Sequence, residues 1–218
     1  RTRTLPWVWS PPSRLRDQRE LPRIRMTLVR LRTMIKNRVH ATLSKYAIKI
    51  DEVSDIFRGT GRKLLEDRLH ELPPCTAQCV KEQLELLDQV QEQFRESKRK
   101  IESIVRATPA MQLLMSVPGA GKILAVVIAM EVGDVNRFSG PEKLASYAGT
   151  VPRIKASGDK IFHGPVRPDV NRYLKWPFSE AANTIAIFHK RWIGRHTASL
   201  YLRLREKKGH AKAIVAVA

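Results

Sequence analysis

The chain has 218 residues, of which 40 are lysine or arginine and 21 are aspartate or glutamate, so its formal charge at pH 7 is +19. This excess of positive charge favours a polyanionic partner, most often nucleic acid, although an anionic membrane surface or an acidic protein would also match it. No run of about 18 apolar residues could cross a bilayer, and no secretory signal precedes the body of the chain, so we expect no insertion into a membrane.

The charge divides the chain into three expected domains. Residues 1–49 are strongly basic, residues 50–107 are nearly balanced, and residues 108–218 are basic again. We expect a strand and a long helix in the first, a helical or coiled-coil linker in the second and a helical domain in the third. The fold class predicted for the whole chain is therefore mainly α.

The first domain is predicted to begin with a strand. LPWVWSPP (5–12) alternates apolar and bulky residues before two prolines, as a strand that leaves a sheet does. Trp7 and Trp9 would share one exposed face and promote association.

A long helix is predicted to follow. From Ser13 to Tyr46, apolar residues recur every three or four positions and form an amphipathic stripe: Leu21, Ile24, Leu28, Leu31, Ile35, Val39 and Leu43. Pro22 marks either the true start of this helix or a kink. The arginine-rich face of residues 14–38 either follows the backbone of DNA or RNA or is a solvated surface.

The middle domain is predicted to contain a turn and a charged helix. FRGTGRK (57–63) has the glycines of a turn. From Thr76 to Val105, Gln91 and Lys98 interrupt a seam of apolar residues: Val80, Leu84, Leu87, Phe94, Ile101 and Val105. We expect an antiparallel hairpin, an imperfect coiled coil that packs on residues 13–48 or on a second copy of the chain. An ordinary helix on a globular core is the alternative.

Two cysteines, Cys75 and Cys79, stand at the start of this charged helix in the segment CTAQC. A zinc site would need two more ligands at suitable spacing, so we interpret both as helix-surface or packing residues. A reducing, intracellular compartment suits this use of cysteine.

The third domain is predicted to be mostly helical, because strand signals are scarce. The long stretch 149–169 is expected to be irregular. Trp176 and Trp192 lie in apolar helical patterns, and we expect them in the core rather than as surfaces on which bases stack.

The turn SVPGAGK (116–122) matches a phosphate-binding P-loop only in part. A P-loop needs glycine where Ser116 stands, and it needs a hydroxyl for Mg²⁺ where Ile123 stands. A strand should also lead into the loop, whereas MQLLM has a helical pattern. Nucleotide hydrolysis is therefore the weakest of the functions considered.

A helix–hairpin–helix matches this turn better. Pro118, Gly119 and Gly121 would let the backbone turn tightly between two apolar helices, and Lys122 adds charge. The second helix would begin with unpaired N–H groups at its positive end, which bind a DNA phosphate without base information. Ala125 would permit close packing of the two helices. The alternative is a helical hairpin that merely turns a corner.

Small and polar residues stand among cations in the stretch 149–169. Ser157 precedes a glycine and is a candidate nucleophile for a phosphodiester, because nearby cations would stabilise charge on the phosphoryl oxygens. The candidate phosphate-binding cations are Arg153, Lys155, Lys160 and Arg167. A solvated basic face is the alternative for these cations. The role of His163, in proton transfer, phosphate binding or neither, stays open.

Four short motifs, in the order in which they follow along the chain, resemble those of a known family. Pro-Gly-x-Gly (118–121), Arg-Phe (137–138), Tyr-Ala-Gly-x-x-Pro (147–152) and Ser-Gly (157–158) resemble the C-terminal half of transposases of the insertion sequence 110 family. The likeness covers most of residues 108–218. LPWVWSPP and RTMIKNRVHATL also resemble the segment that precedes that half.

The resemblance implies a function and a site. Family members join an N-terminal nuclease half, in which four acids bind Mg²⁺, to this serine-containing half. By position, the serine that is thought to join covalently to DNA is Ser157. The chain would be a DNA transposase fragment that binds DNA. In the complete protein it would cleave and exchange strands through the serine during transposition of an insertion sequence.

The chain departs from the family pattern at its start. The family's acids precede the LPWVW-like strand, where this chain begins, so residues 1–49 would be a remnant of the nuclease half. We transfer no metal ligand or cofactor to this chain, and we expect Mg²⁺ only for the complete protein. Whether the chain is an enzyme stays open, and we expect it to be inactive alone.

The expected partners are DNA, a guide RNA transcribed from the element, and a second copy bound through the coiled coil. The expected location is the bacterial cytoplasm, at the nucleoid. The alternative function comes from another class: a non-catalytic helix–hairpin–helix protein that binds nucleic acid and dimerises through a coiled coil. Only the transposase function requires that the Ser157 hydroxyl be accessible to a phosphodiester.

Overall fold

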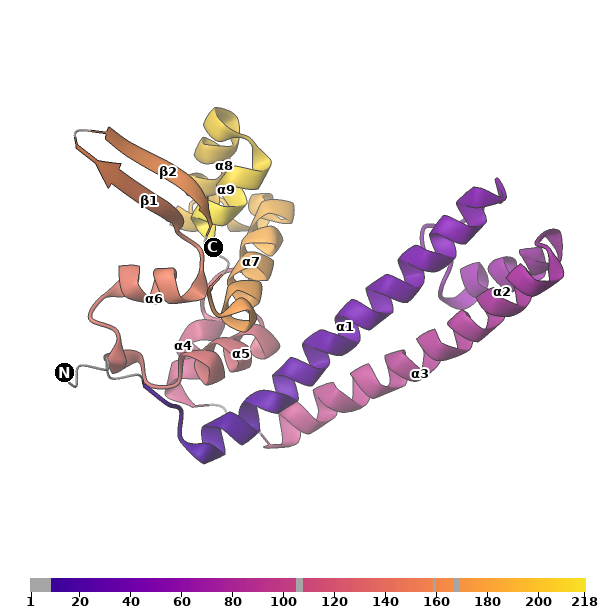
Figure 1. The fold of residues 1–218 in the computed structure, drawn as a ribbon, viewed down its shortest axis with the longest axis horizontal. Coiled ribbons are helices and arrows are strands. Elements are labelled where there is room, and N and C mark those ends of the chain that lie inside the picture. Colours follow the sequence, from indigo (N-terminus) through magenta and orange to yellow (C-terminus); the bar gives the residue numbers. More distant parts are fainter. Residues whose placement is uncertain (1–8, 105–107, 159, 167–168) are drawn as a thin grey trace, which may run out of the picture. The chain divides into compact units, whose positions relative to one another are not determined.

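The computed structural model is described for all residues except 1–8, 105–107, 159 and 167–168, and for the backbone alone at 104, 155, 163, 165 and 166. The described part is mostly helical, which confirms the mainly-α prediction, and its strands form one β-hairpin (Figure 1). The chain divides into two compact units: unit 1 is Arg1–Pro22 with Val105–Ala218, and unit 2 is Arg23–Ile104. Within the described residues, no helix has both the length and the hydropathy that a membrane span requires.

Unit 2 is built on two long helices. Its elements are most of α1 (Ser13–Lys45), then α2 (Gly59–Asp67), the 3₁₀ helix η1 (Arg68–Glu71) and α3 (Pro74–Ile104). Figure 1 shows α3 returning antiparallel beside α1, with α2 near the end where the chain reverses. α1 begins at Ser13, as the periodicity predicts, so Pro22 is not its start but a buried residue inside it.

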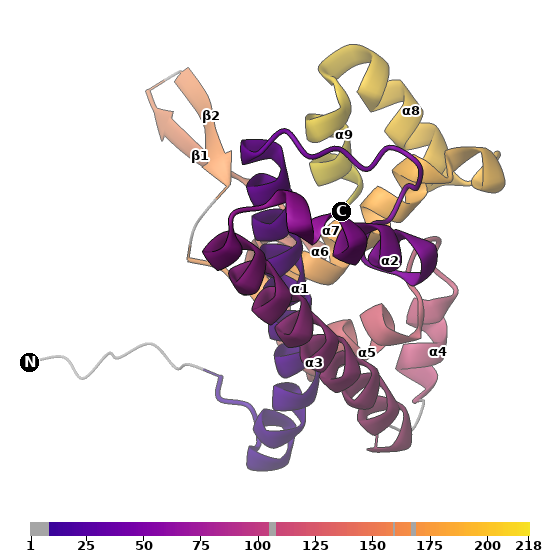
Figure 2. The ribbon, with the colours of Figure 1, turned by 90° about the vertical axis from the view of Figure 1, so that its right-hand side faces the viewer.

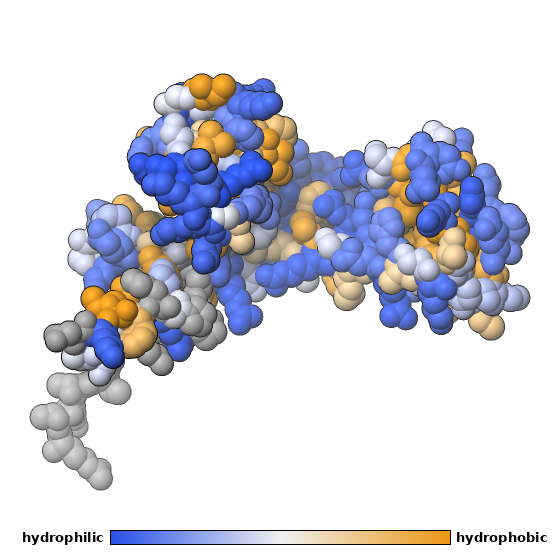
Figure 3. Space-filling view, turned by 90° about the horizontal axis from the view of Figure 1, so that it is seen from above, coloured by the Kyte–Doolittle hydropathy of each residue, from blue (hydrophilic) through white to orange (hydrophobic). Residues whose placement is uncertain are grey.

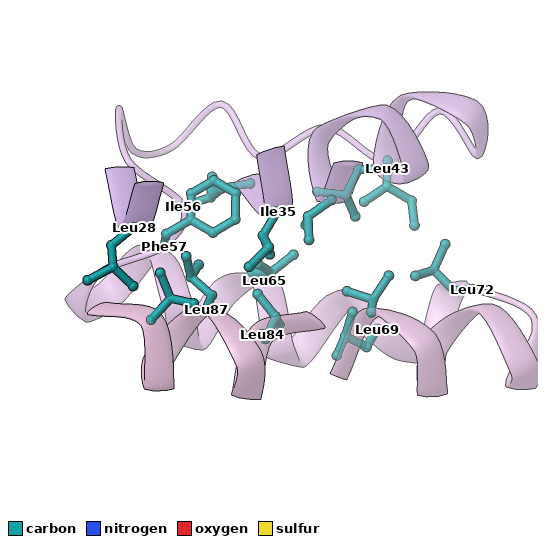
Figure 4. Packing of buried hydrophobic residues seen from close by; sticks show 14 residues of the cluster. Leu28, Ile35, Leu43, Ile56, Phe57, Leu65, Leu69, Leu72, Leu84 and Leu87 are labelled. Carbon is teal, nitrogen blue, oxygen red and sulfur yellow. The ribbon is translucent and has the colours of Figure 1, made fainter. Parts of the chain in front are cut away.

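The core of unit 2 lies between these helices. The residues buried from the two long helices are Leu28, Ile35, Val39 and Leu43 of α1 and Val80, Leu84, Leu87 and Val90 of α3. Residues after α1 add another group to the same cluster: Ile48, Ile56, Phe57, Leu65, Leu69 and Leu72 (Figure 4). α3 therefore packs on α1 of the same chain.

The apolar lines on both helices differ from the predicted ones. Ile24 and Leu31 are exposed, because they lie on the flank of the line that Leu28 and the later core residues form along α1. On α3, Val90 and Ser97 are buried. Each stands one position before a residue, Gln91 or Lys98, that was expected to interrupt the seam. The Ser97 hydroxyl donates to the Phe94 carbonyl at 2.8 Å, so its polar group is satisfied there. The interruption predicted at Gln91 and Lys98 is thus wrong.

The two short motifs of unit 2 have different outcomes. Cys75 and Cys79 are exposed on α3, as predicted for surface residues. The turn predicted at 57–63 is wrong beyond its first residues, because α2 begins at Gly59. Gly61 is inside this helix, where a Cβ would lie 2.9 Å from the Ile56 Cα, so this glycine permits close packing of the helix on the preceding loop.

Unit 1 holds the remaining elements. They are the first turns of α1, α4 (Pro109–Met115), α5 (Lys122–Val132), η2 (Val135–Arg137), α6 (Pro141–Ala148), β1 (Pro152–Ser157), β2 (Lys160–Val166), α7 (Arg172–Ile187), η3 (His189–Trp192), α8 (His196–Lys208) and α9 (His210–Val217). Ile128 and Val132 of the apolar helix α5 pack with Ala148 of α6 and Leu174 of α7. A second cluster joins α7, α8 and α9. The β1–β2 hairpin projects from these helices in Figures 1 and 2.

The hairpin overturns the prediction that residues 149–169 are irregular. Its strands read PRIKAS and KIFHGPV, and they contain proline, glycine and charged side chains that obscure a strand pattern. Trp176 and Trp192 were expected in the core, and both are only half-buried.

The predicted strand at residues 5–12 has two outcomes. Residues 5–8, with Trp7, lie outside the described residues, and residues 9–12 form no strand. Trp9 is half-buried rather than exposed. The Arg137 guanidinium lies 4.1 Å from the centroid of its ring, and a Cβ on Gly133 would lie 3.0 Å from that ring. The exposed face expected for Trp9 is wrong, because residues far along the sequence cover it.

Leu84 tests the core of unit 2. We expect Leu84→Ala to lower the free energy of unfolding by about 2–5 kcal/mol, since it removes a fully buried side chain and leaves a cavity. Leu86 is on the same helix but 48% exposed, so Leu86→Ala should change stability by less than about 0.5 kcal/mol. Urea unfolding followed by circular dichroism measures both; equal losses would contradict this core.

Candidate functional site

The candidate nucleophile Ser157 lies at the turn of the β1–β2 hairpin. It is the last residue of β1, and its backbone pairs with Lys160, the first residue of β2. Gly158 has φ +58, a left-handed conformation that glycine adopts without strain, so the chain reverses directly after the serine. Ser157 is exposed and lies outside the apolar clusters of unit 1. Its hydroxyl is therefore accessible to a large substrate.

The hairpin has two chemically different faces, because side chains alternate along each strand. One face holds Ser157, Lys160 and Phe162, and the backbone of Lys155 pairs with that of Phe162 in the same register. We call this the serine face. Ile154, Ala156 and Ile161 lie on the opposite face, which we call the isoleucine face.

The structure describes the candidate cations of this region to different extents. Lys160 is exposed directly across from Ser157. Arg153 is exposed beside Gly164, and its guanidinium lies 3.7 Å from the Asp169 carboxylate. Such an ion pair at the surface contributes little to stability. Lys155 lies in β1, but the position of its ammonium group is not described. Arg167 lies outside the described residues.

The backbone register places His163 on a different face of the hairpin from Ser157. Its backbone pairs with that of Ile154, in the register of the isoleucine face. By the register of the backbone, position 163 therefore belongs to the opposite face of the hairpin from Ser157. The role of His163 stays open.

Asn171, which follows the hairpin, ties the chain to three elements. Its side-chain oxygen accepts from the Tyr173 and Leu174 N–H groups, both at 3.1 Å, and so caps the N-terminus of α7. Its amide nitrogen donates to the Glu131 carboxylate at 2.9 Å and to the Tyr147 hydroxyl at 3.2 Å. The Asn171 backbone N–H donates to the Tyr147 carbonyl at 3.0 Å. The start of α7 is thereby joined to α5 and α6.

Glu131 is the buried centre of this network. It stands at the end of the apolar helix α5 with none of its surface exposed. The Arg19 side chain of α1 donates to the carbonyls of Met130 at 2.8 Å and Glu131 at 2.9 Å, and its Nε lies 3.9 Å from the Glu131 carboxylate. A buried carboxylate needs such partners. We call Arg19, Glu131, Asn171 and Tyr147 the anchor network.

The motif search missed Arg19 and Glu131, although the sequence carries a signal for the second. In KILAVVIAMEV, Glu131 is the only acid, and every residue between it and Lys122 is apolar. An acid in such a helix must find a buried partner, but the sequence does not say which of the 40 cations or other polar groups supplies it.

The α4–α5 turn uses its two glycines differently. Gly119 has φ +82, and a Cβ there would overlap the Ala181 backbone of α7, with 3.1 Å to its carbonyl carbon. Gly121 has φ −75 and open space around it, and it begins α5 without a side-chain cap. Gly119 therefore packs against protein, and Gly121 leaves the N-terminus of α5 accessible.

The neighbours of these glycines are partly as predicted. Lys122 is exposed at the N-terminus of α5, and Pro118 is half-buried. Ala125 is fully buried, in keeping with close helix packing at this position. Whether the pair α4–α5 is a helix–hairpin–helix stays a prediction.

α7 follows the hairpin in the chain and packs on the α4–α5 turn. Its N-terminal cap is Asn171, and Ala181 in its middle contacts Gly119 of that turn. The serine face brings Ser157, Lys160 and Phe162 together, whereas Lys122 and Gly121 belong to the start of α5. Figure 3 shows a mostly hydrophilic surface over the part of unit 1 that holds the hairpin and the C-terminal helices.

The described residues do not fit a metal site. Among them, no three His, Cys, Asp or Glu side chains come together in a way that could hold a metal ion. The four-acid Mg²⁺ site implied by the family resemblance therefore has no counterpart in the described part of the chain, and we derive no step through a metal.

Comparison with known proteins identifies relatives of unit 1 and of the whole chain. A model of the transposase family described as IS116/IS110/IS902 matches residues 111–198. The IS110 uncharacterized 43.6 kDa protein of Streptomyces coelicolor is 41% identical over 90 residues, which are 41% of this chain and 22% of that protein. The IS1111A transposase of Coxiella burnetii is 26% identical over 212 residues, 93% of this chain and 55% of the relative.

A third relative is the IS1328 transposase of Yersinia enterocolitica, 27% identical over 140 residues, which are 64% of this chain and 41% of the relative. The chain thus spans between 22% and 55% of the length of these relatives. The family match includes the α4–α5 turn, the hairpin and the cap of α7.

Gly119 and Gly121 form a matched pair for mutation. We expect Gly119→Ala to lower the free energy of unfolding by more than about 2 kcal/mol, because a left-handed non-glycine residue costs about 1–2 kcal/mol and the overlap with Ala181 adds to it. Gly121→Ala should cost less than about 1 kcal/mol. Thermal unfolding measures both, and a smaller loss for Gly119→Ala would contradict the contact with α7.

Asn171 tests the anchor network. We expect Asn171→Asp to be less stable than Asn171→Ser at pH 7 by roughly 1–3 kcal/mol, because both keep a capping oxygen but the aspartate places a second carboxylate against Glu131. The difference should narrow as the pH is lowered, since one carboxyl group then takes up a proton. Urea unfolding between pH 5 and pH 8 measures it. A pH-independent difference would argue against the contact with Glu131.

Proposed function

Because this chain belongs to the IS116/IS110/IS902 family of transposases, we propose that it binds DNA through unit 1. We further propose that, in the complete transposase, Ser157 is the nucleophile of strand cleavage and exchange. The observation that carries the proposal is the place of Ser157: an accessible hydroxyl at the turn of a projecting hairpin, with Lys160 directly opposite.

The proposed reaction follows from this arrangement. The Ser157 oxygen attacks phosphorus and forms an O–P bond, while the bond from phosphorus to the leaving sugar oxygen breaks. The serine proton passes to solvent, and the leaving oxygen takes up a proton. The Lys160 ammonium group offsets the negative charge that develops on the phosphoryl oxygens. The energy of the phosphodiester is kept in the O–P bond, so a second sugar hydroxyl can reverse the step on a new strand.

The N-terminus of α5 supplies the proposed second contact with DNA. Its first N–H groups carry partial positive charge, Gly121 leaves them accessible, and Lys122 adds a full charge. Such a site holds a phosphate irrespective of sequence. Gly119, beside this terminus, packs on the Ala181 backbone, so the α4–α5 turn has a fixed place on α7.

A non-catalytic, nucleic-acid-binding protein is the second candidate function. The α4–α5 turn favours it, because phosphate binding by Gly121 and Lys122 needs no nucleophile. The guide RNA, dimerisation through the long helices, Mg²⁺ in the complete protein and the nucleoid location stay predictions.

Ser157→Ala separates the two functions. In a protein that carries this chain together with the nuclease half, we expect the variant to lose covalent protein–DNA adducts while its affinity for DNA changes less than about twofold. Ser199, an exposed serine of α8, provides the control variant Ser199→Ala, which should keep the adducts. The adducts are counted on denaturing gels with a nicked DNA substrate that traps the intermediate.

Three outcomes are informative. Adducts that persist in Ser157→Ala remove this serine from the mechanism. Salt-sensitive binding without adducts in the unmodified protein favours the non-catalytic function. Each phosphate contact contributes about −0.9 to the log–log slope of affinity against salt for duplex DNA, so a flat response would contradict DNA binding itself.

A further inference from the structure

The serine face carries an exposed aromatic ring that the proposed reaction does not use. Phe162 is 58% exposed, although a phenyl ring is among the side chains that gain most from burial. It lies in β2 two residues after Lys160, on the same face, and so stands diagonal to Ser157 across the hairpin. Diagonal neighbours in an antiparallel pair are about 7–8 Å apart, a distance that an aromatic side chain spans.

The surroundings of this ring are cationic. Lys160 precedes it on the same face, and Arg153 is exposed on the neighbouring strand. Proteins that bind single strands combine these two features: cations follow the phosphates, and aromatic rings stack on the bases. A hairpin of two strands has no second layer of its own to cover the ring, so the ring is available to a ligand.

We propose that Phe162 stacks on a base of an unpaired DNA strand and so positions the adjoining phosphodiester at Ser157. The inference rests on the proposed function and extends it to the substrate, which is unpaired at the point of attack. A base inside a duplex is covered on both faces by its neighbours, and a protein reaches it only after unstacking it. Phe162 is thus a positioning residue that selects a single-stranded or frayed segment.

The isoleucine face provides a matched control. Ile161 is the neighbour of Phe162 in β2 and is 66% exposed, so we expect its replacement to change hairpin stability to a similar extent. It lies on the face without Ser157 or Lys160. A loss of binding through an unfolded hairpin would appear in variants at both positions, whereas a loss of stacking would appear only at Phe162.

The test uses the full chain and a single-stranded DNA oligonucleotide that carries 2-aminopurine, whose fluorescence is quenched when a ring stacks on it. We expect Phe162→Ala and Phe162→Leu to weaken binding by about five- to a hundredfold and to abolish the quenching, since leucine keeps the apolar bulk but has no ring. Phe162→Trp should retain both. Ile161→Ala should stay within about twofold of the unmodified chain.

A fully paired duplex of the same sequence gives the second arm. Its affinity should change less than about twofold in Phe162→Leu, because the ring finds no exposed base. The inference is overturned if Phe162→Leu binds and quenches like the unmodified chain, if Ile161→Ala loses as much as Phe162→Ala, or if an RNA oligonucleotide is bound in place of DNA. If instead the proposed function is wrong, the unmodified chain itself shows no salt-dependent binding to either the single strand or the duplex.

Discussion

The buried carboxylate of Glu131 and its partners are the interaction on which unit 1 depends. Arg19 attaches the start of α1 to the last turn of α5, and Asn171 attaches the start of α7 to the same carboxylate. Removing either partner would leave charge in an apolar interior, which is costly. The anchor network therefore fixes the start of α7 against α5 and α6.

The hairpin of unit 1 is exposed at the residues that the proposed reaction uses. Two strands alone are marginally stable in water, and the described strands pair only with each other. The cap of α7 by Asn171 belongs to the helical part of unit 1, which has a buried core of its own. Ser157, Lys160 and Phe162 are all exposed on the hairpin, as the proposed attack on a DNA strand requires.

Elements with a long, regular period were predictable, and contacts between distant residues were not. The helix predicted from Ser13 to Tyr46 is α1, Ser13–Lys45, because its apolar residues recur over many turns. The predicted seam of α3 passed through positions 91 and 98, whereas the buried residues are Val90 and Ser97. Steps of three and of four residues both fit a helix, so the pattern did not distinguish these neighbours. The strands within residues 149–169 were missed because glycines, prolines and cations hide the alternation of a two-stranded hairpin, none of whose described side chains is buried.

The sequence by itself determined the charge, the helical character, the likeness to a transposase family and the choice of the candidate serine, because composition, period and local motifs are properties of neighbouring residues. Only the tertiary structure decided that Gly119 serves packing while Gly121 stays open, that Trp9 is covered by Arg137 and Gly133, and that Ser157 shares a face with Phe162. These facts depend on strand register and on which backbones approach one another. Distant residues set both, and a linear pattern does not record them.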